Sequence, residues 1–150
     1  MADPLSSSDT LARMDEGWAT FNGRVTSLPT ERLAVRIGDG WTRKQMLAHI
    51  ATWHDLTVDR LTKFADSGEP AELGDTDDAI NGRAARAAEG RTTGEIVLAM
   101  ADSYRRLRRA VAALTDDQLA AHEGWAAAIV AGNSFGHYAE HLPDLEGDRR

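Results

Sequence analysis

The chain has 150 residues, which is enough for one domain with a sizeable hydrophobic core. Its formal net charge of −7 argues against nucleic-acid binding, because proteins that bind nucleic acids usually present a basic surface to the phosphates. The sequence contains no cysteine, so disulfides, thiolate ligands and a cysteine nucleophile are excluded, and any metal must be held by nitrogen or oxygen atoms.

Apolar residues at helical spacing dominate the start of the chain. The stripe over residues 11–28 alternates steps of three and four residues and predicts a long helix. Ser8 or Asp9 would cap the beginning of this helix. A short helical turn is expected over residues 30–35, and the two glycines of 38–40 then break the chain.

The second long helix is predicted to begin after that break. Thr42 and Gln45 have the spacing of a capping box, and a wide apolar arc follows over residues 46–64. Gly68 is expected to close this helix. A short alanine-rich helix over 77–88 would form the crossover that carries the chain along the bundle.

The second half of the chain repeats this pattern. Thr92 and Glu95 form another capping-box pair, and an apolar stripe over 96–114 predicts the third long helix. A short helix or turn capped by its first threonine is expected over 115–121. The last predicted helix covers 125–142, although its glycines lower its helix propensity.

These elements predict an all-α four-helix bundle with a crossover connection and short extra helices, forming a single domain over residues 1–150. No stretch shows the strict alternation of apolar and polar residues that is expected of strands. No apolar run reaches the about 18 residues that a membrane span requires. The polar N-terminus does not resemble a secretory signal, so we expect a cytoplasmic protein without membrane partners.

Three of the five histidines are candidates for one metal site. His137 and His141 are four residues apart, so on a helix both side chains lie on one face. A third ligand must come from another helix, and His49 lies on the apolar side of the second long helix. His54 points about 140° away from His49 and is not expected to serve the same site.

Three neutral imidazoles with open positions suit a divalent ion, with zinc or nickel favoured. The alternative interpretation is that each histidine is a hydrogen-bonded residue of the core, which is the commoner role of a single buried histidine. Glu140 is expected at the surface or beside the ligands, and Asp55 has no assigned chemistry.

Other conspicuous side chains have structural interpretations. An arginine cluster on the third long helix is expected to form a solvated face. Several aromatic residues would pack in the core more readily than line a pocket, and Tyr138 is a possible hydrogen-bond donor beside the histidines. The arginines are Arg105, Arg106, Arg108 and Arg109, and the aromatic residues are Trp18, Trp53, Trp125 and Tyr138.

Three segments resemble the DinB/YfiT-like superfamily and together cover most of the chain. LARMDEGWATFNGRVTSLPTERL (11–33) resembles its first helix, and GDGWTRKQMLAHIATWHD (38–55) resembles its second-helix signature. GNSFGHYAEHLPDL (132–145) resembles its final helix with a His-x-x-x-His pair. The resemblance implies a four-helix bundle, often a homodimer, with metal ligands at His49, His137 and His141.

Known relatives in that superfamily include thiol S-transferases that use bacillithiol or mycothiol, and the N-terminal domain of the mycothiol-dependent maleylpyruvate isomerase is similar. The resemblance therefore implies a metal-dependent transferase that joins a thiol such as mycothiol to electrophilic small molecules. Two alternatives stay open. One is a metal-free hydrolase or a self-resistance protein that sequesters a small molecule, with Glu140 or Asp55 as acid or base. The other is a non-enzymatic, stress-related binding module.

Overall fold

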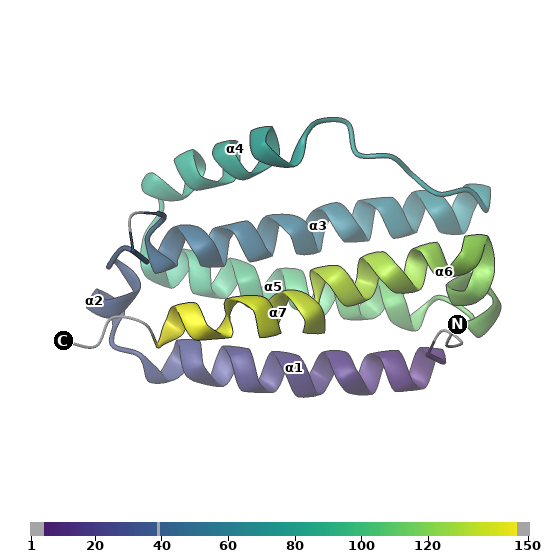
Figure 1. Cartoon of the computed structure of the whole chain (residues 1–150), viewed down its shortest axis with the longest axis horizontal. Coiled ribbons are helices and arrows are strands. Elements are labelled where there is room, and N and C mark those ends of the chain that lie inside the picture. The colour runs from purple at the N-terminus through teal and green to yellow at the C-terminus, as the bar shows by residue number, and fades with distance from the viewer. Residues whose placement is uncertain (1–4, 39, 147–150) are drawn as a thin grey trace.

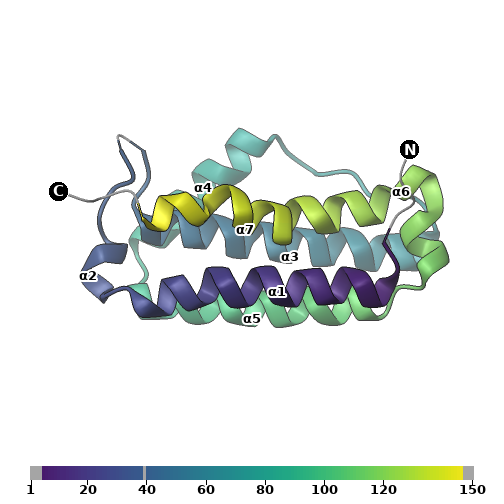
Figure 2. The same ribbon diagram turned by 60° about the horizontal axis from the view of Figure 1, so that its bottom comes forward.

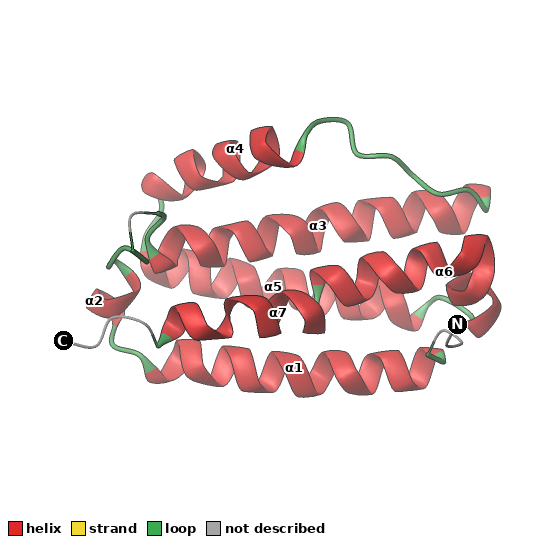
Figure 3. Ribbon diagram, in the orientation of Figure 1, coloured by secondary structure: helices red, strands yellow, loops and turns green. Residues whose placement is uncertain are grey.

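A computed structural model of the chain describes residues 5–38 and 40–146 and confirms the all-α fold. Figure 3 shows helices joined by loops, and the described residues contain no strand. The elements in chain order are α1 (Ser7–Ser27), α2 (Thr30–Leu33), α3 (Arg43–Ser67), α4 (Asp77–Glu89), α5 (Thr93–Ala112), α6 (Asp116–Asn133), α7 (Phe135–His141) and the 3-10 helix η1 (Leu142–Leu145).

Four helical rows form the bundle. In Figure 1, α1, α3, α5 and the continuous row made by α6 and α7 run along the long axis of the molecule, and α4 lies outside them beside α3. The view in Figure 2 shows α1 alongside α5 and alongside α7. The core between these rows is apolar, and its fully buried side chains include Met14, Phe21, Leu47, Ile50, Met100, Leu107 and Leu119.

Side-chain caps begin the helices at the positions that the sequence signals indicated, with one correction. Complete capping boxes or the predicted threonine cap are present at Thr42, Thr92 and Thr115. The first helix is different, because its cap is Ser6, whose hydroxyl accepts the backbone N–H of Asp9. The predicted caps Ser8 and Asp9 are therefore wrong, since both lie inside the first turn of α1.

The last predicted helix is interrupted. It was expected as one element over 125–142, but α6 ends at Asn133 and α7 begins at Phe135. The break lies at Ser134, where φ is −128° and ψ is −107°. Gly136 is required here, because a Cβ at that position would lie 2.8 Å from the carbonyl oxygen of Ala131.

A second irregularity lies near the start of α6. His122, Glu123 and Gly124 have consecutive positive φ values of 53°, 58° and 80°, a left-handed conformation that costs a non-glycine residue about 1–3 kcal/mol. One stabilising contact is the hydrogen bond that joins His122 Nε2 to the carbonyl oxygen of Gly68 at 2.7 Å. The turn places Trp125 against α3, where α6 begins its run along the bundle.

Within the described part of the chain, no helix has the length and apolar character that crossing a membrane requires.

Candidate metal centre

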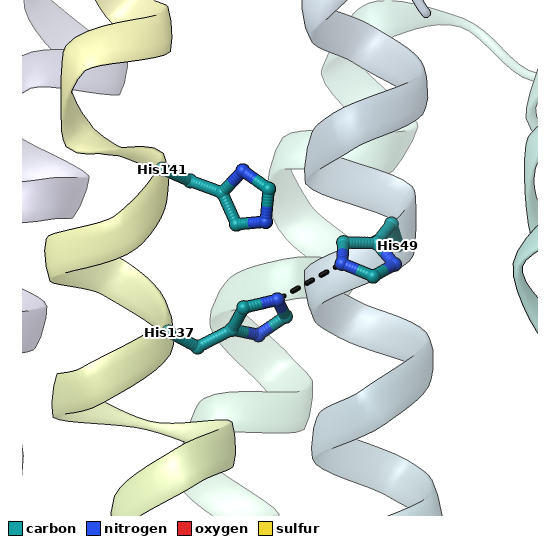
Figure 4. Close-up of side chains that lie close together, drawn as sticks. All are labelled: His49, His137 and His141. Atoms are coloured by element: carbon teal, nitrogen blue, oxygen red, sulfur yellow. Dashed lines mark hydrogen bonds between the residues drawn. The ribbon is translucent and has the colours of Figure 1, made fainter. Parts of the chain in front are cut away.

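Two neighbouring helices bring three histidines together. His49 projects from α3, and His137 and His141 project from one face of α7 toward it (Figure 4). Each ring offers one nitrogen, and these three nitrogens lie within 4.8 Å of one another. The shortest separation is 2.9 Å between the Nε2 atoms of His49 and His137. The predicted convergence is therefore present in the fold.

The protonation of the His49 ring is fixed by a neighbour on the crossover helix. Asn81 Oδ1 lies 2.7 Å from the Nε1 of Trp53 and 2.9 Å from the Nδ1 of His49. The indole N–H can only donate, so the Asn81 atom must be the accepting oxygen. His49 Nδ1 must then carry the hydrogen that it donates to Asn81, and its Nε2 lone pair faces the other histidines.

His141 is oriented in the same manner by a carboxylate. Its Nδ1 lies 2.9 Å from Oδ2 of Asp144, which follows it on η1. Since an ionised carboxylate only accepts, His141 Nδ1 donates, and Nε2 is the nitrogen left for a ligand. A histidine whose outer nitrogen donates to a carboxylate or carbonyl oxygen is the usual arrangement around protein-bound metals.

His137 completes the cluster and has no such outer partner. It is buried, and its Nδ1 has no hydrogen-bond partner among the residues that the structure describes. Burial, followed by the nearby His49 and His141 rings, lowers the pKa of His137 from its ordinary value to about 3. Burial also lowers the pKa of His49. Both rings are therefore neutral near pH 7, the form that binds metal.

The donor set fits a divalent ion. Three imidazoles from two helices are available, and in two of them Nδ1 donates to an outer partner, which leaves Nε2 for a ligand. No protein group outside the cluster competes for the third ring, whose outer nitrogen lacks a partner among the described residues. The cluster can thus hold a metal ion.

A pocket of about 550 Å³ opens onto the three histidines. It runs between α3, α4 and the α6–α7 row, and both apolar and charged side chains line it. Besides the histidines, the lining includes Trp41, Trp53, Arg60, Leu73, Asp77, Asn81, Ile129, Asn133 and Glu140. A cavity of about 470 Å³ on the other side of α7, between α1 and α7, contains no histidine. A bound ion would therefore act on molecules in the pocket of about 550 Å³.

His54 lies outside the histidine cluster, as its predicted direction implied, and is buried in the core. Ser103 Oγ donates to the backbone oxygen of Met100, so it accepts from His54 Nδ1 at 2.8 Å. His54 Nε2 then accepts the hydroxyl hydrogen of Tyr138 at 2.7 Å. Burial lowers the pKa of His54 to about 3. Tyr138 therefore points away from the histidine cluster and is not a donor to it.

The remaining sequence candidates have structural partners or lie at the rim of the pocket. Asp55 is paired with Arg106 at 2.9 Å, which gives it no role at the histidines. Arg108 pairs with Asp15, and Arg105 pairs with Asp102, so arginines of this face form ion pairs with neighbouring carboxylates. Exposed Glu140 lines the pocket without contacting a histidine nitrogen in any hydrogen bond. Trp18 stacks on Tyr104 in the core, whereas Trp53 lines the pocket.

Two residues that sequence reasoning missed hold the ligand rings. Asp144 follows His141 by three residues, a spacing that places both side chains on one helical face and was available as a signal. Asn81 had no signal, because it lies 32 residues from His49 and reaches it only when α4 packs on α3.

Similarity to known proteins agrees with this architecture. A family model described as the DinB superfamily matches residues 13–144. The chain belongs to the DinB superfamily. No curated protein matches this DinB-superfamily chain. It is similar to the crystal structure of an uncharacterised protein from Escherichia coli UTI89, with a TM-score of 0.81 and 14% identity over 96% of this chain and 92% of that chain. At that identity the likeness shows the fold alone.

Proposed function

We propose that the chain is a metal-dependent enzyme whose ion is held by His49, His137 and His141. The observation that carries the proposal is the convergence of three ligand nitrogens within 4.8 Å, with Asn81 and Asp144 orienting two of the rings. Membership of a superfamily that often binds metal supports it.

Zinc or nickel is the ion that this donor set favours, because borderline divalent ions prefer imidazole nitrogen over hard oxygen ligands. When bound, such an ion supplies Lewis acidity that lowers the pKa of a coordinated thiol or water. The chain supplies two histidine rings whose Nδ1 atoms donate to outer partners. It also supplies a pocket for the reactants, in whose wall the Trp41 ring lies 5.2 Å from that of His49.

The reaction that we propose is transfer of an external thiol, such as mycothiol, to an electrophilic small molecule. The sulfur–carbon bond forms as the bond from carbon to the leaving group breaks, and the leaving group departs with the thiol proton. The chain has no cysteine, so the sulfur must come from a cosubstrate. The pocket of about 550 Å³ beside the histidines can accept small reactants.

Metal analysis with two matched variants tests the proposal. We expect about one divalent ion per wild-type chain, a strong loss in His141→Ala, and full occupancy in His122→Ala, whose ring bonds Gly68 outside the pocket. A thiol-conjugation assay with and without chelator then tests catalysis. Failure to bind zinc, nickel or cobalt even on titration, or an equal loss in both variants, would overturn the proposed centre.

The direct contact between His49 and His137 favours a second candidate. At 2.9 Å the Nε2 of His137 can donate to the Nε2 lone pair of His49, so these two nitrogens pair without an ion. A metal-free hydrolase, or a protein that sequesters a small molecule in the same pocket, would use them in this form. The same titration separates the candidates, because this one requires that no ion binds.

A further inference from the structure

The pocket beside the histidines has a second charged end. Arg60 lies on α3, 11 residues after His49, which corresponds to three turns or about 16 Å along the helix axis. Both residues line the same pocket. A molecule that occupies the whole pocket would therefore meet imidazole nitrogens at one end and a guanidinium at the other.

Arg60 is held in place by neighbours that leave its terminal amino groups free. Its Nε donates to the backbone oxygen of Ala71 at 3.0 Å, and its Cζ lies 5.3 Å from the centroid of the Trp125 ring. Trp125 in turn packs on Phe64, with ring centroids 5.3 Å apart. Arg60 forms no ion pair with a carboxylate of the described residues, and neither Nη atom has a hydrogen-bond acceptor there.

Trp125 directly follows the left-handed turn over 122–124. That turn costs free energy, and residues kept in such a conformation cluster at functional sites. The residue after this turn, Trp125, presents the aromatic face that the guanidinium of half-buried Arg60 contacts. The orientation of Arg60 is thus fixed before any ligand arrives, which reduces the entropy lost when a ligand binds.

Between its two ends the pocket wall includes the apolar side chains of Trp53, Leu73 and Ile129, beside the polar amides of Asn81 and Asn133. Two carboxylates also line it, Asp77 and Glu140, but both residues are exposed to solvent. Their charges are screened by water more strongly than the charge of half-buried Arg60. The apolar part of this wall and Arg60 together suit a ligand with an apolar body and an anionic end.

We propose that Arg60 binds the carboxylate of an elongated, apolar acid whose other end reaches the three histidines. The free Nη atoms of a guanidinium can donate two parallel N–H···O bonds to a carboxylate, and a phosphate offers the same oxygen geometry. The assignment names the substrate class of the proposed enzyme and rests on that function only for the histidine end of the pocket.

Metal-free protein tests the Arg60 end alone. Octanoate, octyl phosphate and octanol share one apolar body, and their binding can be followed by NMR from the indole N–H of Trp125 and the Nε–H of Arg60. We expect the anions to bind about five-fold more tightly than octanol, with shifts at both reporter groups. Equal affinity of all three probes, or shifts confined to other residues, would show that Arg60 is not an anion site.

Variants assign the effect to one side chain. Arg60→Met is expected to abolish the preference for the anions, and Lys63→Met, which removes an exposed charge from the same helix, is expected to keep it. Arg60→Lys keeps the charge without the fork and is expected to keep part of the preference. A full preference in Arg60→Met would refute the assignment, and the wild-type shifts decide the question if that variant does not fold.

Cobalt-substituted protein tests the two ends together. Binding of ω-mercaptoalkanoates of increasing length, with ω-mercaptoalkanols as neutral controls, can be followed by sulfur-to-cobalt charge-transfer absorption. We expect the carboxylate to tighten binding only when the chain is long enough to reach Arg60. If cobalt does not bind, the proposed function fails while the octanoate result still stands. If cobalt binds and no length gains from the carboxylate, the two-ended substrate is wrong.

Discussion

Replacing Asn81 by leucine removes the acceptor that fixes the His49 tautomer. Asn81 Oδ1 accepts from His49 Nδ1 at 2.9 Å and from Trp53 Nε1 at 2.7 Å, so the variant leaves both donors without this partner. The His49 proton can then move to Nε2, the atom that faces the other histidines. Loss of an outer partner of this kind typically weakens metal binding about 10–100-fold, or about 1.4–2.8 kcal/mol.

Zinc affinity can be measured for this variant by competition with a chromophoric chelator near pH 7. Asn81→Asp keeps an accepting oxygen at the same position and is expected to bind zinc at least as tightly as the wild type. Asn22→Leu makes the same substitution on α1, outside the pocket, and is expected to leave the affinity unchanged. If Asn81→Leu binds zinc within about two-fold of the wild type, the argument that Asn81 orients His49 is wrong.

Gly136, His54 and Asp144 give three further predictions. Gly136→Ala should lower the free energy of unfolding by about 1–3 kcal/mol, because the added Cβ would lie 2.8 Å from a backbone oxygen. Gly132→Ala should not lower it, because no atom lies within 4 Å of the added Cβ. Urea denaturation of both variants compares the two effects. The pKa of His54 is about 3 when folded and ordinarily 6.5, so between pH 6.5 and about pH 3 the unfolded chain binds up to one more proton. In this range the free energy of unfolding should fall by about 1.4 kcal/mol for each unit by which the pH is lowered, and it should fall less steeply in His54→Gln. Equal pH dependence of the wild type and this variant would contradict the argument. Asp144→Ala should weaken zinc binding about ten-fold or more in the chelator competition, and an unchanged affinity would contradict its orienting role.

The features that the sequence predicted are those with local signals. The capping box of Thr42 and Gln45 and the apolar arc behind it determine where α3 begins and which side it buries. The four-residue spacing of His137 and His141 places both rings on one face of a helix, whatever surrounds that helix. Three imidazoles on two adjacent helices could therefore be matched before the fold was known, with the resemblance supporting the choice of His49.

The features that the sequence did not predict depend on contacts between distant segments. The left-handed conformation of His122 is stabilised in part by the carbonyl oxygen of Gly68, 54 residues away, so no local propensity indicates it. Asn81 likewise depends on the packing of α4 on α3. The homodimer, the mycothiol cosubstrate and the cytoplasmic location stay predictions, and sedimentation, thiol assays and fractionation are the measurements that check them.

The short helix α7 serves two surfaces at once. His137 and His141 face α3, while Phe135 approaches the position of Gly17 on α1 and Tyr138 reaches the buried ring of His54. A ligand that binds His137 and His141 and thereby stabilises the packing of α7 on α3 also stabilises the packing of α7 on α1. An ion present at about a hundred times its dissociation constant would add about 2.7 kcal/mol to folding. Metal binding should thus protect α7 against proteases, in addition to its chemical role in the pocket.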